Sequence, residues 1–293
     1  MTIGIDIGGT NIKGVLLRGN KVIAKRKIKT KSKSDKKMLL AQIFECIEFL
    51  LKKGKRVKRI GIGVAGPVDF KNQKVLNPPN VTGLKGLYLG KIIKRKFGIK
   101  TIIDNDVHLL VLAEAILGAG REKNLVVGLG LGTGVGGGIV LNKKILYGAG
   151  GTAGEIGHTI IKKDGRECTC GSRGCLEAYI SERGIRRTAK EIFGKEIDTI
   201  SLFEMAKKGD RKAVKVWQIT GQYLGISLAN IVDDFNPDII IIGGGIAGAG
   251  EFLLSPARRE MRKNILSPLA KNTKVVRAKL GEYAGAIGAS LLL

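Results

Sequence analysis

Two segments of this chain share one pattern, and that pattern constrains the fold more than any other feature. One is TIGIDIGGTNIKGVLLR near the start, and the other is LVVGLGLGTGVGGGIVLN near the middle. Aligning Gly9 with Gly132 also places Gly14 on Gly137, with apolar residues on both sides of each glycine cluster. Because each copy reads as two strands joined by a glycine-rich turn, the repetition predicts an internal duplication in which each copy opens its own half of the chain.

Helix and strand signals alternate after each copy. Apolar residues recur at helical spacing from Lys36 to Lys53, and buried strands are predicted at RIGIGVAG, KTIIDND and PDIIIIGGG. Further helices are predicted over Lys85 to Phe97, VHLLVLAEAILG, Arg211 to Val232 and GEYAGAIGASLLL. This order is typical of an α/β protein. We expect two α/β domains, a smaller one over residues 1–117 joined by a terminal helix at about 280–293, and a larger one over residues 118–279.

Composition narrows the class of protein. Hydrophobic residues make up 44% of the 293 residues, yet no apolar run approaches the roughly 20 residues that span a bilayer. The chain starts directly in a strand pattern without a signal segment, so we expect a cytoplasmic protein with no membrane partner. The formal charge of +26 is concentrated in lysine-rich runs of the first hundred residues. Aromatic residues are not interleaved with those runs, which favours a solvated surface, or attraction of an anionic substrate, over a nucleic-acid site.

The first glycine-rich turn suits phosphate binding. Gly8 and Gly9 allow backbone N–H groups to approach a phosphate closely, Thr10 can donate from its hydroxyl, and Asp6 is placed to hold Mg²⁺. Neither glycine segment has the spacing of a P-loop or of a dinucleotide-binding loop. Each alone is compatible with a simple hairpin turn, but two at equivalent places in a duplication favour phosphate binding.

Three of the four cysteines lie in the segment CTCGSRGC, as Cys168, Cys170 and Cys175. His158 lies ten positions before the first of them. Three thiolates and one imidazole form the closed tetrahedral set of a structural Zn²⁺ site. Free thiols and a disulfide are the alternatives. Cys46 lies on the apolar face of a predicted helix and is expected to be a core residue.

Several motifs together resemble those of the ROK-family sugar kinases. They are DIGGTNIKG, GVAGPVD, DNDV, GLGLGTGVGGGIV, GEIGH and CTCGSRGCLE, in that order, and they cover nearly the whole chain. The resemblance implies the actin-like ATPase (ribonuclease H-like) fold, with a cleft between two domains. It also implies Mg²⁺-dependent transfer of phosphate from ATP to a hexose, usually at the 6-hydroxyl, and commonly a homodimer.

The resemblance also assigns roles to individual residues. It makes Asp106 the general base that accepts the proton of the sugar hydroxyl, although Asp106 could instead be the N-cap of the helix that follows it. Sugar-binding roles are implied for Gly66, Asn80, Asn105, Asp106, Glu155, His158 and Glu177. The nucleotide and Mg²⁺ are expected to lie against Asp6, Gly8, Gly9, Thr10, Asn11, Lys13, Gly132, Thr133, Gly134, Gly243, Gly244 and Gly245. A structural role is expected for Asp104.

Two departures from the family pattern stand out. No tryptophan follows Asn80, where many members have one, and His108 occupies a position where a small or amide residue is common. We interpret His108 as a partly exposed residue on the face of a helix.

A ring nitrogen of His158 that does not bind zinc would remain for a sugar hydroxyl.

Glucose is the simplest sugar to expect, but other acceptors stay open. An N-acetylated amino sugar, mannose, fructose or allose could each be selected by a single contact near the 2-position. A sugar-responsive transcription regulator is a further alternative, because the family includes repressors. Those proteins carry a helix-turn-helix domain, and no such pattern precedes Asp6 in this sequence.

Overall fold

The structure is a computed structural model that describes residues 1–292, and the chain forms two compact units. Unit 1 comprises Met1–Glu122, Lys143–Ala153 and Lys279–Leu293, and unit 2 comprises Lys123–Asn142 and Gly154–Ala278. The chain therefore leaves and re-enters unit 1 twice.

Unit 1 is built on a mixed five-stranded sheet in the order β3-β2-β1-β4-β7. Strands β1, β2 and β3 are antiparallel neighbours, whereas β4 runs parallel to both β1 and β7. The bounds are β1 Thr2–Ile7, β2 Asn11–Arg18, β3 Lys21–Lys29, β4 Arg59–Val64 and β7 Lys100–Asn105, with a small hairpin formed by β5 Val68–Asp69 and β6 Lys74–Val75. The helices are α1 Lys36–Lys52, α2 Leu89–Phe97, α3 Asp106–Leu117 and α9 Ala284–Leu291.

Unit 2 repeats the arrangement. Its strands pair in the order β9-β8-β11-β12, with β8 and β9 antiparallel and the other pairs parallel. The strand bounds are β8 Leu125–Leu131, β9 Val135–Leu141, β11 Ile239–Gly243 and β12 Lys274–Arg277, and the short β10 Lys144–Ile145 follows β9 in the chain. The helices are α4 Glu177–Ile180, α5 Glu182–Phe193, α6 Thr199–Lys207, α7 Arg211–Phe235 and α8 Glu251–Asn264.

The two sheets confirm the duplication predicted from the glycine segments. The order β2-β1-β4-β7 in unit 1 corresponds to β9-β8-β11-β12 in unit 2, with the same strand directions. In both copies an antiparallel hairpin is followed by parallel strands, which a chain reaches through long crossover connections that here contain helices.

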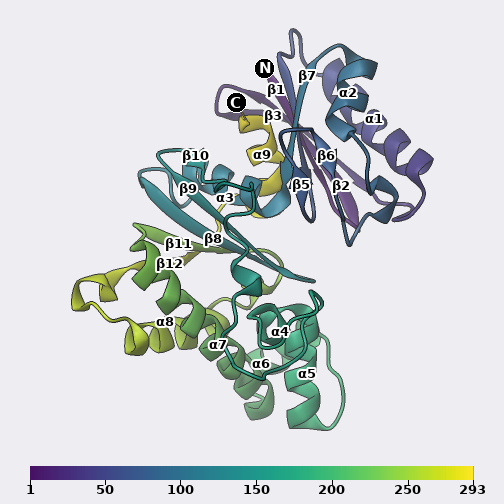
Figure 1. The fold of residues 1–293 in the computed structure, drawn as a ribbon. Coiled ribbons are helices and arrows are strands. Elements are labelled where there is room, and N and C mark those ends of the chain that lie inside the picture. Colours follow the sequence, from purple (N-terminus) through teal and green to yellow (C-terminus); the bar gives the residue numbers. More distant parts are fainter. Residues whose placement is uncertain (293) are drawn as a thin grey trace. The chain divides into compact units, whose positions relative to one another are not determined.

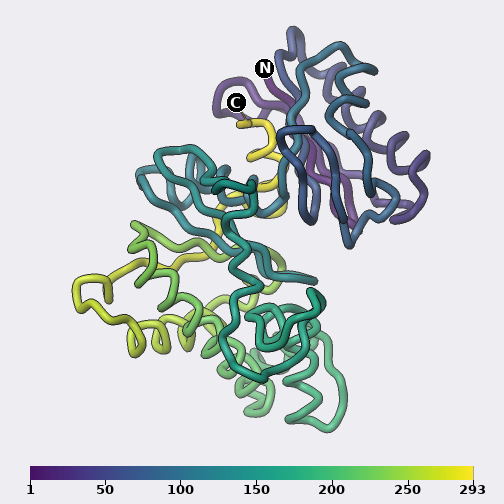
Figure 2. The backbone as a smooth tube through the Cα atoms, viewed as in Figure 1, coloured from purple at the N-terminus to yellow at the C-terminus, as the bar shows by residue number. Residues whose placement is uncertain are grey.

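Helices cover both faces of the first sheet. In Figure 1, α1 and α2 lie on one side of it, and α9 lies on the other. The C-terminal segment, yellow in Figure 2, thus returns to the N-terminal strands. The approach is close at Gly61 of β4, where a Cβ atom would lie 1.7 Å from the carbonyl oxygen of Ala289 in α9. A side chain at Gly61 would therefore force α9 away from the sheet.

Each unit has its own hydrophobic core. The core of unit 1 is rich in isoleucine from the sheet and in apolar residues of α1, and it includes Cys46, whose side chain is fully buried. The expectation that Cys46 is a core residue is confirmed. In unit 2 the core surrounds Trp217, which lies on α7 and is 1% exposed.

Two predicted helices begin later than their patterns suggest. The helix expected from Lys85 begins at Leu89, because residues 82–84 form a 3-10 turn and Gly86 has a φ of 75°. The C-terminal helix begins at Ala284, after a 3-10 turn at residues 281–283. None of the helices in residues 1–292 is both long enough and apolar enough to cross a membrane.

Glu114 of α3 fastens the segment by which the chain returns to unit 1. Its side chain is fully buried, and its carboxylate accepts backbone hydrogen bonds from Ala119 at 2.8 Å, Lys279 at 2.8 Å and Leu280 at 2.7 Å. Three backbone N–H donors from two separate segments therefore depend on a single buried side chain.

We expect Glu114→Gln to lower the free energy of unfolding by about 1–3 kcal/mol, because an amide replaces one of the acceptor oxygens and removes the charge. Urea denaturation followed by far-UV circular dichroism measures this, and hydrogen exchange at Lys279 and Leu280 should accelerate. The matched control is Glu122→Gln, because Glu122 is exposed. Equal stability of the two variants would contradict the anchoring role.

Candidate active site

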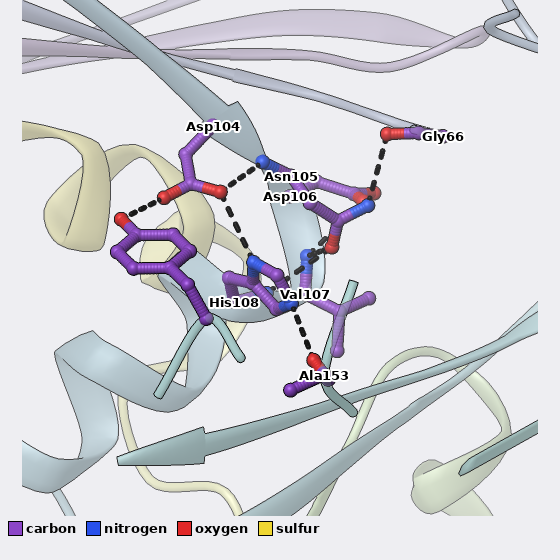
Figure 3. A network of polar contacts seen from close by, with 8 residues as sticks. Gly66, Asp104, Asn105, Asp106, Val107, His108 and Ala153 are labelled. Atoms are coloured by element: carbon purple, nitrogen blue, oxygen red, sulfur yellow. Dashed lines mark hydrogen bonds and ion pairs between the residues drawn. The ribbon is translucent and has the colours of Figure 1, made fainter. Parts of the chain in front are cut away.

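The carboxyl end of β7 and the start of α3 hold the predicted base in unit 1 (Figure 3). Asn105 is the N-cap of α3: its side-chain oxygen accepts hydrogen bonds from the N–H groups of Val107 at 2.8 Å and His108 at 3.2 Å. Its amide nitrogen donates to the carbonyl oxygen of Gly66 at 3.1 Å. The alternative that Asp106 is the N-cap is therefore wrong, because the amide of Asn105 makes those bonds and Asp106 begins the first turn.

Asp106 lies near a second carboxylate, that of Asp6. Asp6, the penultimate residue of β1, lies opposite Gly63 of β4, and a Cβ atom on Gly63 would lie 3.6 Å from the Cα atom of Asp106. Burial raises the pKa of Asp6 to about 7, the Asp106 carboxylate adds to the increase, and the Lys13 ammonium opposes it. Desolvation also raises the pKa of Asp106, although hydrogen bonds from the Val107 N–H and from its own N–H, and the charge of His108, act in the opposite direction.

A raised pKa at Asp106 gives a pH prediction. A carboxylate can accept the proton of a hydroxyl only in its ionised form, so kcat/KM should fall as the pH falls through that pKa. The acid limb should lie above the value of an ordinary aspartate, about 3.9. A pH profile of kcat/KM for the sugar, at saturating ATP, measures it. An acid limb of kcat/KM at the ordinary aspartate pKa of about 3.9 would contradict the prediction.

The first glycine turn lies beside another predicted site residue. A Cβ atom on Gly9 would lie 2.8 Å from the carbonyl oxygen of Asn80, so these two segments are in contact within unit 1. The turn is closed by a hydrogen bond from the Gly8 N–H to the Asn11 carbonyl at 3.0 Å. Lys13 pairs with Asp6 across the β1–β2 hairpin, and its ammonium donates to the Glu282 carbonyl at 2.9 Å.

The second glycine turn, Gly132 to Gly134, joins β8 to β9 in unit 2. The turn at Gly243 to Gly245 follows β11, the parallel neighbour of β8, and a Cβ atom on Gly244 would lie 2.2 Å from the Leu131 carbonyl oxygen. The structure therefore brings together the two glycine turns for which nucleotide contacts are predicted in this half of the chain.

Glu177 connects the second glycine turn to the cysteine segment. One carboxylate oxygen accepts a hydrogen bond from the Val135 N–H at 2.9 Å, and the other accepts one from the Thr169 hydroxyl at 2.7 Å. The first oxygen lies so close that a Cβ atom on Gly134 would be 2.7 Å from it. Glu177 was predicted to bind sugar, and both of its oxygens already have protein partners.

The four predicted metal ligands converge in unit 2. One donor atom from each of His158, Cys168, Cys170 and Cys175 lies within 4.8 Å of all the others. His158 ends a 3-10 turn, and Cys175 forms an isolated β-bridge with Ile160. A hydrogen bond from the Cys168 N–H to the Ser172 carbonyl, at 2.9 Å, closes the cysteine loop.

The distances in this cluster fit a zinc ion. The Sγ atoms of Cys170 and Cys175 are 3.7 Å apart, as are the Cys168 Sγ and the Nδ1 of His158. Tetrahedral bonds of about 2.3 Å to sulfur and about 2.1 Å to nitrogen place the ligand atoms about 3.6–3.8 Å apart. These four side chains would hold the ion by three sulfur atoms and Nδ1, so Nε2 of His158 would be available to another partner.

The other residues predicted to bind the sugar lie in both units. Gly66 and Asn105 are hydrogen-bonded to each other beside Asp106. Glu155 lies in unit 2 next to the 3-10 turn of His158 and is exposed. Gly66, Asn80, Asn105 and Asp106 are thus placed in unit 1, and Glu155, His158 and Glu177 in unit 2.

A polar network next to the predicted base has no clear signal in the sequence. Asp104 is 3% exposed and contacts His108 and Tyr147, so its predicted structural role is confirmed. His108 is 8% exposed, and the interpretation of it as a partly exposed residue is wrong. The one sequence signal was its unusual residue type. Tyr147 gave none, because it lies 43 positions from Asp104 and reaches it only in the folded chain.

Comparisons with known proteins identify the family. The sequence model of the ROK family matches residues 2–293. The chain is 34% identical to the glucokinase of Thermotoga maritima over 99% of this chain and 96% of that protein. It is 31% identical to the N-acetyl-D-glucosamine kinase of Photobacterium profundum, over 100% of this chain and 99% of that protein. It is also 30% identical to the xylose repressor of Bacillus subtilis, over 100% of this chain and 76% of the repressor.

Solved structures of ROK-family kinases resemble this chain in fold. A ROK hexokinase from Thermus thermophilus superposes with a TM-score of 0.87 at 33% identity, over 99% of this chain and 96% of the other. A ROK-family glucokinase from Streptomyces griseus, in complex with glucose and AMPPNP, superposes with a TM-score of 0.84 at 31% identity. The match covers 99% of this chain and 97% of the other.

The chain belongs to the ROK family and has its actin-like ATPase fold. It is a sugar kinase, with a sugar and ATP as substrates.

Proposed function

We propose that this enzyme transfers the γ-phosphoryl group of ATP to the 6-hydroxyl of glucose, with Asp106 as general base. The observation that carries the proposal is the position of Asp106, which begins α3 directly after the N-cap residue Asn105 and has a carboxylate with a raised pKa. A base with a pKa nearer neutrality is a better proton acceptor in the transition state. The similarity to several glucokinases supports the sugar.

The residues divide the chemical work. Asp106 accepts the proton of the sugar 6-hydroxyl. At the same time the oxygen of that hydroxyl attacks the γ-phosphorus of ATP, and ADP leaves. Gly66, Asn80, Asn105, Glu155, His158 and Glu177 orient the sugar. The glycine turns that contain Gly8 and Gly9 and Gly132 and Gly134 would bind the phosphates, together with Thr10, Asn11, Lys13 and Thr133. Gly243, Gly244 and Gly245 would lie by the adenosine. Asp6 would hold Mg²⁺, which when bound neutralises charge on the phosphates.

The cysteine segment supports this site without reacting. A structural zinc ion on His158, Cys168, Cys170 and Cys175 would fix the direction of the His158 ring and leave Nε2 for a sugar hydroxyl. The distances between donor atoms support this assignment. From the family resemblance we also propose a cytoplasmic homodimer, which light scattering on the purified protein would test.

A panel of hexoses tests the substrate. The ratio of kcat/KM values for glucose, mannose, fructose, allose and N-acetyl-D-glucosamine, each with ATP, should favour glucose. Preference for the N-acetylated sugar would place the enzyme with the amino-sugar kinases, which the relative from Photobacterium profundum makes the second candidate. Sequence-specific duplex binding at physiological salt, without kinase activity, would instead support a regulator of the kind represented by the xylose repressor.

A further inference from the structure

Asp104 accepts hydrogen bonds from three directions. Its Oδ1 atom accepts the backbone N–H of Asn105 at 2.7 Å and faces Nδ1 of His108 at 3.0 Å, and its Oδ2 atom accepts the hydroxyl of Tyr147 at 2.5 Å. Burial and the Asp104 charge raise the pKa of Tyr147, so that its phenol keeps the proton it donates. All three contacts are satisfied when Asp104 is an ionised carboxylate.

Both ring nitrogens of His108 face acceptors. Nδ1 faces the Asp104 carboxylate, and Nε2 lies 3.2 Å from the carbonyl oxygen of Ala153 (Figure 3). A carbonyl oxygen cannot donate a hydrogen bond. A neutral imidazole has one N–H, so it would direct a lone pair at one of these two oxygens. With Asp104 acting only as an acceptor, the imidazolium form, with its two N–H groups, is the form that satisfies both contacts.

We infer that His108 is a positively charged positioning residue that joins the Asn105–Asp106 turn to the chain before Glu155. On one side it holds Asp104, which binds the N–H of Asn105. On the other it holds the carbonyl of Ala153, the last residue of its segment of unit 1. Glu155 follows two positions later.

The packing around Ala153 makes this contact specific. The N–H of Ala153 donates to the Tyr147 carbonyl at 3.1 Å, which closes residues 147–153 into a loop. The Tyr147 ring stacks on Phe70, with centroids 4.5 Å apart and planes at 16°. Both ends of the loop are thus tied to the Asp104 network, one by the Tyr147 hydroxyl and the other by the Nε2 of His108.

The charge of His108 also acts on the base. The ionisable groups that contact His108 or interact with its charge include Asp104 of β7, Asp106 of α3 itself, and Tyr147 of the loop, whose ring centroid lies 6.0 Å from that of His108. The packed segment of α9, Ala284–Leu291, has no ionisable side chain. A positive charge near Asp106 favours its ionised form and opposes the effect of burial. Loss of that charge should therefore move the acid limb of kcat/KM to higher pH.

The charge can be measured directly, because the chain contains two histidines. In the enzyme labelled with ¹⁵N-histidine, NMR should show both ring nitrogens of His108 protonated from about pH 6 to about pH 8, where an ordinary histidine loses its proton. The spectrum of His108→Gln assigns the signals by their loss. A single protonated nitrogen at neutral pH would overturn the inference, whether or not any variant folds.

Kinetics test the positioning role, which rests on the proposed function of Asp106. His108→Gln keeps a hydrogen-bond donor without the charge and should lower kcat about tenfold or more, because small displacements of reacting groups are costly. Its acid limb should move to higher pH, while KM for ATP stays the same. Tyr147→Phe, which removes a neutral donor and keeps the aromatic ring, should leave the limb in place. An unchanged kcat and acid limb in His108→Gln would overturn the role.

The two proposals fail in different ways. An active Asp106→Asn enzyme would refute the general base and leave the NMR result on His108 unaffected. A neutral His108 in an enzyme that still requires Asp106 would refute only the present inference.

Discussion

Replacement of Asp106 by asparagine should reduce kcat by about 100- to 10,000-fold, the usual contribution of a positioned general base. An amide has nearly the shape of the carboxylate but cannot accept the proton of a sugar hydroxyl. The first turn of α3 should persist, because the cap is made by Asn105 and not by Asp106. The variant should therefore bind both substrates with little change. Steady-state kinetics with a coupled ADP assay measures kcat, and calorimetry measures sugar binding.

A matched control separates the loss of the base from a general effect of removing an aspartate. Asp234 on α7 is exposed, and Asp234→Asn should retain wild-type kcat. If Asp106→Asn kept sugar-dependent ATP turnover within a fewfold of wild type, the proposed base would be wrong. A variant that lost sugar binding as well as turnover would indicate that Asp106 mainly holds the substrate.

The second large effect is expected at the metal cluster. Cys170→Ser should lower zinc affinity by at least about 10- to 100-fold, because even loss of an outer-shell partner costs this much. Cys170 is the exposed cysteine of the four, so its replacement disturbs packing least. KM for the sugar should rise, since the His158 ring loses its fixed direction. A smaller rise in KM for ATP is expected, because Glu177 ties the cysteine segment to the Val135 N–H beside the glycine turn.

Metal analysis of the purified protein should give one zinc per chain for the wild type and less for Cys170→Ser. The control is Cys46→Ala, which removes a thiol from the core of unit 1 and should leave the zinc content unchanged. A full complement of zinc in Cys170→Ser would contradict the ligand assignment. Equal increases in both KM values would show that the metal serves folding in general and not the sugar site.

The architecture could be predicted because it is repeated in local patterns. The hairpin that begins at Thr2 and the one that begins at Leu125 have matching glycine turns, and their sheets have matching strand order. The helices that begin at Leu89 and Ala284 start later than their apolar patterns predict, because a 3-10 turn precedes each of them. Helical spacing extends through such turns, so apolar periodicity alone does not show where the α-helix starts.

The duplicated α/β fold, the family and the residue types of the Cys/His cluster could be predicted from the chain's local patterns, because glycine turns, apolar periodicity and cysteine spacing are local features. Contacts between residues far apart in the chain became visible in the folded structure. Asp104 meets Tyr147, and Glu114 meets Lys279, across 43 and 165 positions of the chain. His108 was expected to be partly exposed on a helix face, but it is buried between two oxygen atoms that come from separate segments. These long-range contacts depend on how the side chains pack and on the need of buried polar groups for hydrogen-bond partners. Neither can be read from the order of residues along the chain.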